Sequence, residues 1–207
     1  MPHFYDDNED LQFYVDRWID WEPLVRLTEY DYKAPDGFTN SEEAVEFYRD
    51  ILALVGDFAA NEVAPHAAEI DRDHSQLKDG QVVFAPALAN VFEQIKALQL
   101  HGMCLPRELG GMNCPFLLFT LCTELIGRAD VSVTAHNGFH GGSAMAMLLY
   151  SIIEGSTEFD LEQRCITSTR FGDAIAEIVE GEAWGSMDIT EPGAGSDAAS
   201  LKCTCVK

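Results

Sequence analysis

Apolar residues recur every three or four positions between residues 45 and 59, and this spacing constrains the fold more than any other feature of the sequence. Two neighbouring rows share it: Val45, Tyr48, Leu52, Val55 and Ala59, and Phe47, Ile51, Leu54 and Phe58. Together they form the wide apolar face that a helix buries against other helices. Thr39 and Glu42 have the spacing of a capping box, and Pro65 is expected to end the helix.

Four more helices are predicted after this one. The first begins at Pro86, a residue favoured in a first helical turn, and stops near Gly102. The next follows Pro115 and is apolar nearly all round, which places it inside a bundle. Residues 131–151 predict a helix rich in glycine, alanine and serine, suited to close packing against something flat. Residues 161–179 predict the last helix.

The period of the apolar residues changes near the C-terminal end. Residues 201–206, LKCTCV, alternate between two faces as a β-strand does, and residues 184–190 predict a strand before it. The last strand reaches Lys207 without a closing turn, and a sheet of two strands with an open edge is only marginally stable by itself. We therefore expect helices followed by the opening strands of a sheet that a longer protein completes.

The first 38 residues differ from the rest in composition. They are acidic and aromatic, and a turn or linker with Pro35, Asp36 and Gly37 closes them. We expect an N-terminal extension over residues 1–38, a helical domain over 39–181 and the start of a further domain over 182–207.

Charge excludes several classes of partner. Thirteen basic against 35 acidic side chains give a formal net charge of −22, and such a chain repels nucleic acids and anionic membranes. The longest apolar stretch, residues 145–153, is too short to span a bilayer, and the acidic start MPHFYDDNED is unlike a signal peptide. We expect a cytoplasmic protein with neither a nucleic-acid nor a membrane partner.

The cysteines fit that expectation. Four of them stand singly among apolar neighbours, where a cysteine acts as a small buried hydrophobe: Cys104, Cys114, Cys122 and Cys165. Cys203 and Cys205 are two apart, a spacing that matches neither a zinc knuckle nor a redox CxxC pair.

The segment ITEPGAGSD, residues 189–197, has the composition of a ligand-binding turn. Pro192 interrupts strand pairing, while Gly193 and Gly195 permit positive φ and leave the backbone open to approach. Hydroxyls at Thr190 and Ser196 flank the turn. Its accessible amides can hold a planar ring with polar edges or a phosphate, but a plain hairpin turn has the same local sequence.

Two other sets of residues have chemistry to weigh. His136 and His140 are four apart on a predicted helix, a spacing that can seat a metal, but no third ligand accompanies them and several glycines make a poor platform. We expect no metal there and interpret these histidines as packing residues. Arg107 is interpreted as a surface ion-pairing residue.

Four blocks in order along residues 41–207 resemble the acyl-CoA dehydrogenase family. The strongest is MDITEPGAGSD at residues 187–197, which resembles the family signature. Upstream, LHGMCLPRELGG resembles a helix end with a Pro-x-Glu-x-Gly-Gly turn, TELIGRADVS a helix junction, and GSTE the start of the helix before the signature. Residues 10–27 resemble, more weakly, the extension of larger bacterial members.

This resemblance implies a mainly α fold: a helical-bundle N-terminal domain followed by the first strands of an antiparallel β-barrel, here incomplete. It also implies FAD as cofactor, an acyl-CoA thioester as substrate, and α,β-dehydrogenation as the reaction. A carboxylate would remove the α-proton, the β-carbon would lose a hydride to the flavin, and an electron-transfer flavoprotein would reoxidise the cofactor. The full-length enzyme would be a homo-oligomer, dimer or tetramer.

Carried over by position, the resemblance assigns five residues to the cofactor. Met187, Ile189 and Thr190 would face the flavin, and Gly195 and Ser196 would line the cofactor, with Ser196 also at the thioester end of the substrate. The resemblance also suggests a substrate-adjacent place as an alternative for His136 and His140, and a CoA phosphate is the alternative partner of Arg107.

The resemblance assigns no catalytic residue within this sequence and does not decide between related functions. The catalytic base would lie beyond Lys207, so no acid here is assigned that role, and Glu191 is interpreted as structural. Asp188 stands where the family has a small or apolar residue. Two other hypotheses about the function stay open: an acyl-CoA oxidase, and a non-catalytic or partner-dependent subunit that lacks the catalytic domain.

Overall fold

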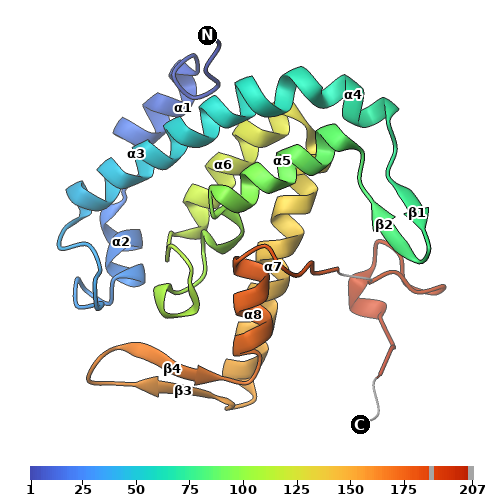
Figure 1. Ribbon diagram of the computed structural model, residues 1–207. Coiled ribbons are helices and arrows are strands. Elements are labelled where there is room, and N and C mark those ends of the chain that lie inside the picture. Colours follow the sequence, from blue (N-terminus) through green and yellow to red (C-terminus); the bar gives the residue numbers. More distant parts are fainter. Residues whose placement is uncertain (187–188, 205–207) are drawn as a thin grey trace.

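The computed structural model describes residues 1–186 and 189–204, and most of them form a helical bundle (Figure 1). The helices are α1 (Glu9–Phe13), α2 (Glu22–Thr28), α3 (Ser41–Phe58), α4 (Ala67–Arg72), α5 (Pro86–Ala97), α6 (Phe116–Ala129), α7 (Val131–Ile153) and α8 (Gly172–Val179). Two antiparallel hairpins accompany them: β1 (Gln76–Lys78) with β2 (Gln81–Val83), and β3 (Thr157–Asp160) with β4 (Cys165–Thr169). The mainly α prediction is confirmed.

Helix α3 begins one residue later than the capping-box prediction. Asn40 is the cap, and its side-chain oxygen accepts from the amide of Glu43 at 2.8 Å. The Glu43 carboxylate in turn accepts from the amide and hydroxyl of Thr39 at 3.0 and 2.9 Å. Asn40 and Glu43 thus take the places predicted for Thr39 and Glu42, but the carboxylate of Glu43 bonds to Thr39, the residue before the cap, and not to the cap residue itself.

The predicted end of this helix at Pro65 is also wrong. Regular α-helix stops at Phe58, a π-helical turn spans Ala59–Val63, and a 3-10 turn spans Ala64–His66 before α4. Pro65 occupies the first turn of that 3-10 segment, where a missing amide costs nothing. The proline therefore begins a new helical segment.

The main core lies where α3, α5 and α6 meet, and the N-terminal residues complete it. Buried side chains of residues 1–38, such as Tyr5, Leu11 and Val15, join the same apolar cluster as α3 and α6. Trp21 packs on Tyr48 with ring centroids 5.3 Å apart, and its indole N–H donates to the carbonyl of Val15 at 2.9 Å. The extension is thus part of the bundle's packing.

Helix α6 follows the prediction for most of its length. Its buried residues recur at helical spacing: Leu118, Leu121, Cys122, Leu125 and Ile126. Phe116, in contrast, is 72% exposed, so the first turn of α6 lies at the surface. A second, smaller apolar cluster joins α7 to α8, which lie side by side.

The helix predicted over residues 161–179 is wrong in its first half, where the chain forms the β3–β4 hairpin. Thr157 and Thr169 pair across it with hydroxyls 2.9 Å apart. The Asp160 carboxylate accepts from the amides of Glu162 and Gln163, each at 2.8 Å, which fixes the turn. The GSTE block therefore leads into a strand, and α8 covers only the second half of the prediction.

The β1–β2 hairpin was not predicted, although its turn carries a recognisable signal. Asp79 and Gly80 both have positive φ, 51° and 78°, as a tight hairpin turn between right-twisted strands requires. The Asp-Gly pair between two short runs was the evidence available in the sequence.

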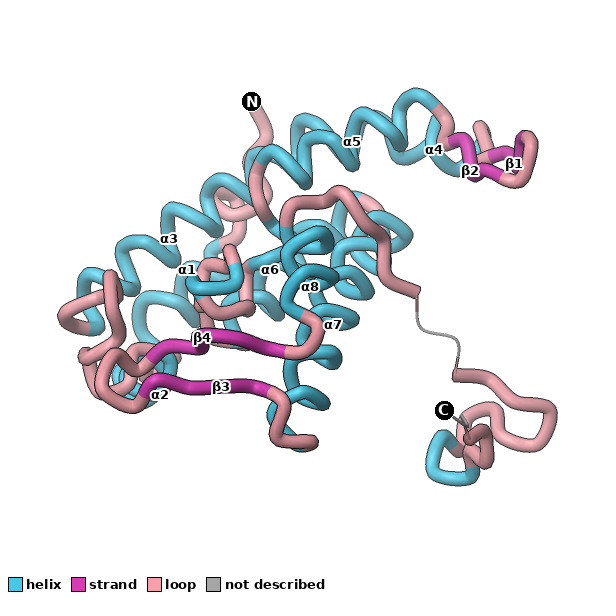
Figure 2. The backbone as a smooth tube through the Cα atoms, turned by 60° about the horizontal axis from the view of Figure 1, so that its bottom comes forward, coloured by secondary structure: helices cyan, strands magenta, loops and turns pink. Residues whose placement is uncertain are grey.

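The predicted C-terminal strands do not form in the described residues. Trp184–Ser186 and Ile189–Thr190 are irregular, Ala198–Ser200 is a 3-10 turn, and Leu201–Thr204 has no strand partner. Figure 2 shows this terminal segment set apart from the bundle. A strand without neighbours has unpaired amides and carbonyls, so the alternating sequence alone does not make a sheet. Residues 205 and 206 of the expected strand lie outside the described residues.

Within the described residues, no helix combines the length and apolar character needed to cross a membrane.

Two glycines allow a matched test of the packing. A Cβ at Gly111 would lie 2.1 Å from the carbonyl oxygen of Leu105, whereas at Gly142, in the middle of α7, it would meet nothing within 4 Å. We expect Gly111→Ala to destabilise by on the order of 3 kcal/mol through overpacking. Gly142→Ala should stabilise by about 0.5–1 kcal/mol through helix propensity. Urea unfolding measures both, and equal effects of the two substitutions would contradict the packing described.

Candidate functional site

The signature segment forms a tight turn with its side chains turned to solvent. Glu191 and Ala194 exchange two backbone hydrogen bonds, 3.2 and 3.1 Å, across Pro192 and Gly193. Ala194 is buried, and the residues on either side of the turn are exposed, as in Ile189 at 52%. The turn thus has a closed backbone and an open outer surface.

Four of the five predicted cofactor residues lie on that outer surface. Ile189, Thr190, Gly195 and Ser196 are all exposed, on the two sides of the turn. Met187 lies outside the described residues, as does Asp188.

The glycines keep space open and do not supply unusual backbone angles. A Cβ at Gly193 or Gly195 would meet nothing within 4 Å, and neither is among the positive-φ glycines. The positive φ that glycine permits is not used at these two positions. What they contribute is a backbone that a ligand can approach without meeting a side chain.

Glu191 holds the end of the segment together. Its two carboxylate oxygens accept from the amides of Lys202 and Cys203 at 2.9 and 2.7 Å. Asp197 accepts from the hydroxyl and the amide of Ser200, which closes the following 3-10 turn. This arrangement agrees with a structural place for Glu191, because its carboxylate ties the turn to the residues that follow it.

An apolar cavity of about 200 Å³ lies between α6, α7 and the loop that follows α5. Three glycines of α7 form one wall, Gly138, Gly141 and Gly142, and the helix is fixed at its start by Asp130. The Asp130 carboxylate accepts from the amides of Ser132 and Val133 at 2.7 and 3.1 Å. The remaining lining is almost entirely apolar: Leu100, His101, Met103, Cys104, Leu105, Phe116, Phe119, Met145, Ala146 and Leu149.

Three imidazoles meet behind this cavity. His136 lies 4.2 Å from His140 and 5.7 Å from His101 between ring centroids, and His101 lies 5.1 Å from His140. Burial lowers the pKa of His101 to about 4 and that of His136 to about 3, and it also lowers the pKa of His140. All three rings are therefore uncharged at neutral pH.

The same imidazoles do not assemble a metal site. Among the residues that the structure describes, no group of three His, Cys, Asp or Glu side chains is placed to hold a metal ion. The Nδ1–H of His140 donates to the carbonyl of His136 at 3.0 Å, which directs that nitrogen into the helix. His136 and His140 are packing residues in this geometry.

The buried cysteines are unreactive thiols. Burial raises the pKa of Cys104 to about 11 and that of Cys114 to about 12, and raises that of Cys122 as well. Cys114 and Cys122 are buried, as predicted, whereas Cys104 and Cys165 are half-buried. A thiol of raised pKa carries little thiolate at neutral pH and is a weak nucleophile.

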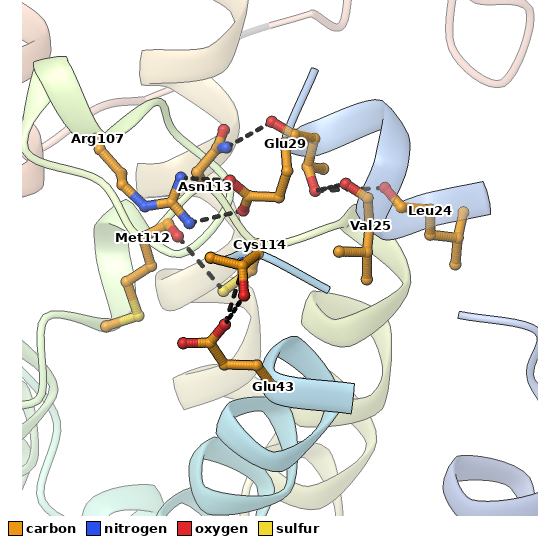
Figure 3. Close-up of polar contacts among 10 residues, drawn as sticks. Leu24, Val25, Glu29, Glu43, Arg107, Met112, Asn113 and Cys114 are labelled. Carbon is orange, nitrogen blue, oxygen red and sulfur yellow. Dashed lines mark hydrogen bonds and ion pairs between the residues drawn. The ribbon is translucent and has the colours of Figure 1, made fainter. Parts of the chain in front are cut away.

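Arg107 is engaged by a buried carboxylate, so the surface interpretation is wrong. Glu29, at the end of α2, is fully buried, and Arg107 donates to its two oxygens at 2.7 and 2.9 Å (Figure 3). The side-chain amide of Asn113 donates to the carbonyl of Thr28 beside it at 2.8 Å. These bonds join the extension to the turn of residues 100–111, and they commit Arg107 to Glu29 in place of a phosphate.

Sequence reasoning missed Glu29, His101 and Trp184. Trp184 lies just before the signature and contacts the imidazoles of His136 and His140. A tryptophan followed by Gly185 at the entrance to the signature was the only signal in the sequence. The partner of Glu29 is 78 residues away along the chain and has no sequence signal.

Known proteins are similar to this chain over most of its length. Residues 46–156 match the N-terminal domain of acyl-CoA dehydrogenases. Mitochondrial isovaleryl-CoA dehydrogenase of Arabidopsis thaliana is 28% identical over 153 residues, 74% of this chain and 32% of that protein. 3-Methylmercaptopropionyl-CoA dehydrogenase of Ruegeria pomeroyi is 24% identical over 199 residues, 95% of this chain and 29% of that protein.

The match covers the helices of the core and shows the family. The chain belongs to the acyl-CoA dehydrogenase family, and its helical bundle is the N-terminal domain of that family. Mitochondrial short-chain specific acyl-CoA dehydrogenase of Sus scrofa is also similar, 28% identical over 79% of this chain and 34% of that protein. The chain spans about a third of the length of the curated relatives it matches.

The Arg107–Glu29 pair can be tested by breaking it. We expect Arg107→Ala to destabilise by about 3 kcal/mol, because it leaves a buried carboxylate without its partner. Arg26→Ala, which removes exposed ion pairs with Asp31 and Glu22, should leave the free energy of unfolding nearly unchanged. Replacing Glu29 and Arg107 together by methionine should recover most of the loss. If Arg107→Ala costs no more than Arg26→Ala in urea unfolding, the pair does not hold the extension.

Proposed function

We propose that this chain is the N-terminal part of an FAD-dependent acyl-CoA dehydrogenase that desaturates an acyl-CoA thioester between its α- and β-carbons. The observation that carries the proposal is the open signature turn at the end of a family N-terminal domain. The proposed domains are the extension over 1–38, the helical domain over 39–181 and the beginning of the barrel over 182–207.

The residues of the turn fit one edge of a flavin. Gly193 and Gly195 leave open space above the backbone, and Thr190 and Ser196 are exposed hydroxyl residues on either side. Thr190 and Ser196 would donate to polar atoms of the ring system, Ile189 would cover its apolar part, and Met187 would join them. FAD, when bound, accepts the two electrons that leave the Cα–Cβ bond.

The helical domain would bind and orient the acyl group. The cavity beside α7 has an almost entirely apolar lining and a volume of about 200 Å³, enough for a short or medium acyl tail. Its glycine wall lets a chain lie close to the helix backbone. Exclusion of water strengthens the electrostatic interactions at the reacting thioester.

The base and the CoA-binding cations would come from elsewhere. Several basic side chains of the described chain are occupied by carboxylates, including Arg49 with Asp16, Arg170 with Glu154 and Lys96 with Glu182. With a net charge of −22, this part repels an anionic CoA ester. We propose that the catalytic carboxylate and the cations for CoA lie beyond Lys207, and that an electron-transfer flavoprotein and further copies of the enzyme are its partners.

Expression of two lengths of the gene tests the proposal. The 207-residue chain should purify without the visible absorbance of flavin and without dehydrogenase activity on acyl-CoA substrates. Protein whose reading frame continues beyond Lys207 should be yellow and should reduce a dye acceptor. A yellow, active preparation of the short chain would contradict the division of the site, and a colourless, inactive longer protein would contradict the function.

Substitutions in the longer protein test the turn. Thr190→Val and Ser196→Ala should each weaken FAD binding on the order of fivefold, since each removes one hydrogen bond worth about 1 kcal/mol. Ser168→Ala, at an exposed hydroxyl of β4, should leave the FAD dissociation constant unchanged. Equal binding by all three variants, measured by flavin fluorescence, would place the cofactor elsewhere.

The cavity gives a further test in the same protein. Gly142→Leu introduces a side chain where a Cβ meets nothing, at the wall of the cavity. It should lower kcat/KM for longer acyl chains about fourfold per excluded methylene, from about 0.8 kcal/mol each, and leave the shortest substrates unaffected. A uniform loss over all chain lengths would show that the cavity does not hold the acyl tail.

A further inference from the structure

Trp184 lies across the imidazoles at the point where the chain leaves the bundle for the signature. Its ring centroid is 4.1 Å from that of His136 and 4.6 Å from that of His140. Phe84, after β2, stacks on it at 4.9 Å, and Phe92 of α5 meets it edge-on at 4.9 Å. Because Trp184 is 47% exposed, one side of the indole is packed on this cluster and the other faces solvent.

Gly185 lets the backbone approach α7 at the next residue. A Cβ there would lie 2.5 Å from both the Cβ and the hydroxyl oxygen of Ser143. No side chain fits at that distance, so the contact exists only because position 185 is glycine. Trp184 and Gly185 together fix the linker against α7 just before the signature.

Four ring nitrogens of the three imidazoles are closed off from water. Within the described residues, His136 Nε2, His140 Nε2 and both nitrogens of His101 are buried without a hydrogen-bond partner. A neutral ring tolerates this at modest cost, but an imidazolium has a charged N–H that needs water or an acceptor. Protonation is therefore incompatible with an indole packed over these rings.

We propose that Trp184 and Gly185 are positioning residues that dock the linker before the signature on α7, and that the docking holds only while His136 and His140 are uncharged. This inference concerns the helical domain alone and does not depend on flavin binding. In the undocked state, His136 and His140 reach solvent, water binds their free nitrogens, and the linker loses its attachment.

Among the described residues, the groups that act on His136 and His140 supply no countercharge that would stabilise a protonated ring. On α7 and the adjoining 3-10 turn (Leu100–Gly102), the ionisable groups that act on His136 are His140 and His101, and both lower its pKa. Lys96 of α5 and Glu182 of the linker are paired with each other. Glu93 of α5 is exposed and acts on Lys96, as does Glu180. The segment of Phe84 and Ala85 contributes no ionisable group.

The direction of the pH effect follows from the difference between the two states. Burial holds the pKa of His136 at about 3, whereas an imidazole in solvent has a pKa of about 6.5. The docked state binds fewer protons, so docking is complete above pH ~6.5 and weakens as the pH falls toward the docked pKa. Each imidazole that protonates lowers the docking equilibrium constant by up to about tenfold per pH unit.

Fluorine NMR of the chain labelled with 5-fluorotryptophan measures docking directly. The chain has three tryptophans, and Trp184→Phe assigns the signal of interest by its loss. At pH 7.5 the Trp184 signal should differ from that of exposed Trp18, and it should move toward it as the pH falls below about 6.5. In the double variant His136→Gln with His140→Gln, the signal should stay at its docked position throughout. A Trp184 signal like that of Trp18 at pH 7.5, or an unchanged titration in the double variant, would overturn the proposal.

A matched glycine pair separates undocking from loss of fold. Gly185→Ala should undock Trp184 at pH 7.5, while Gly193→Ala, where a Cβ meets nothing, should not. Far-UV circular dichroism of both variants should match that of the wild-type chain. In Gly185→Ala, His136 and His140 should titrate near pH 6.5 in proton NMR, and in the wild type they should not titrate as independent groups there. Identical histidine titrations in the two variants would show that Gly185 and Trp184 do not cover these rings.

Discussion

The bidentate ion pair between Glu29 and Arg107 is the interaction on which the rest of the arrangement depends. It is made by a fully buried carboxylate and a largely buried guanidinium, so neither group can lose the other without a large cost. It joins residues 1–38 to the turn of residues 100–111. The same turn binds the β3–β4 hairpin, because the Glu108 carboxylate accepts from the amide of Ile166 at 2.7 Å.

That turn also determines where the cavity and the imidazoles lie. Gly111 lies against the backbone of Leu105. Residues 100–105 provide one wall of the cavity and include His101. Met112 and Cys114 donate their amides to the carbonyls of Gly102 and Met103 at 3.0 and 2.9 Å. An ion pair on one side of the turn thus supports a ligand-sized space on the other.

Helical periodicity made the bundle predictable from the sequence. The apolar rows of α3 and α6 and the prolines before α5 and α6 correctly gave the helices of the core. The β3–β4 hairpin was not predictable in this way, because residues 161–179 contain apolar residues at helical spacing. The hairpin is held by the Asp160 carboxylate in its turn and by the hydroxyl pair of Thr157 and Thr169 across its strands. Arg107 was misread because its partner is distant in sequence, and such pairings follow from the fold.

The site was predictable only in part for a different reason. The signature identified the family, and the structure exposes four of its five assigned residues on one turn. The packing of the linker before that turn, with Trp184 on a face of neutral imidazoles, follows from three-dimensional contacts among the end of β2, α5, α7 and the linker. The histidines drew attention as possible ligands, whereas their geometry gives them a packing role.

The central claim is that this chain supplies one edge of a flavin site, and a crystal structure of the longer gene product with FAD and an acyl-CoA analogue tests it most directly. The account predicts the flavin ring against the turn of residues 189–196, with Thr190 and Ser196 within hydrogen-bond distance of it. It also predicts the acyl tail in the cavity beside Gly138, Gly141 and Gly142. A flavin bound without contact to this turn would contradict it.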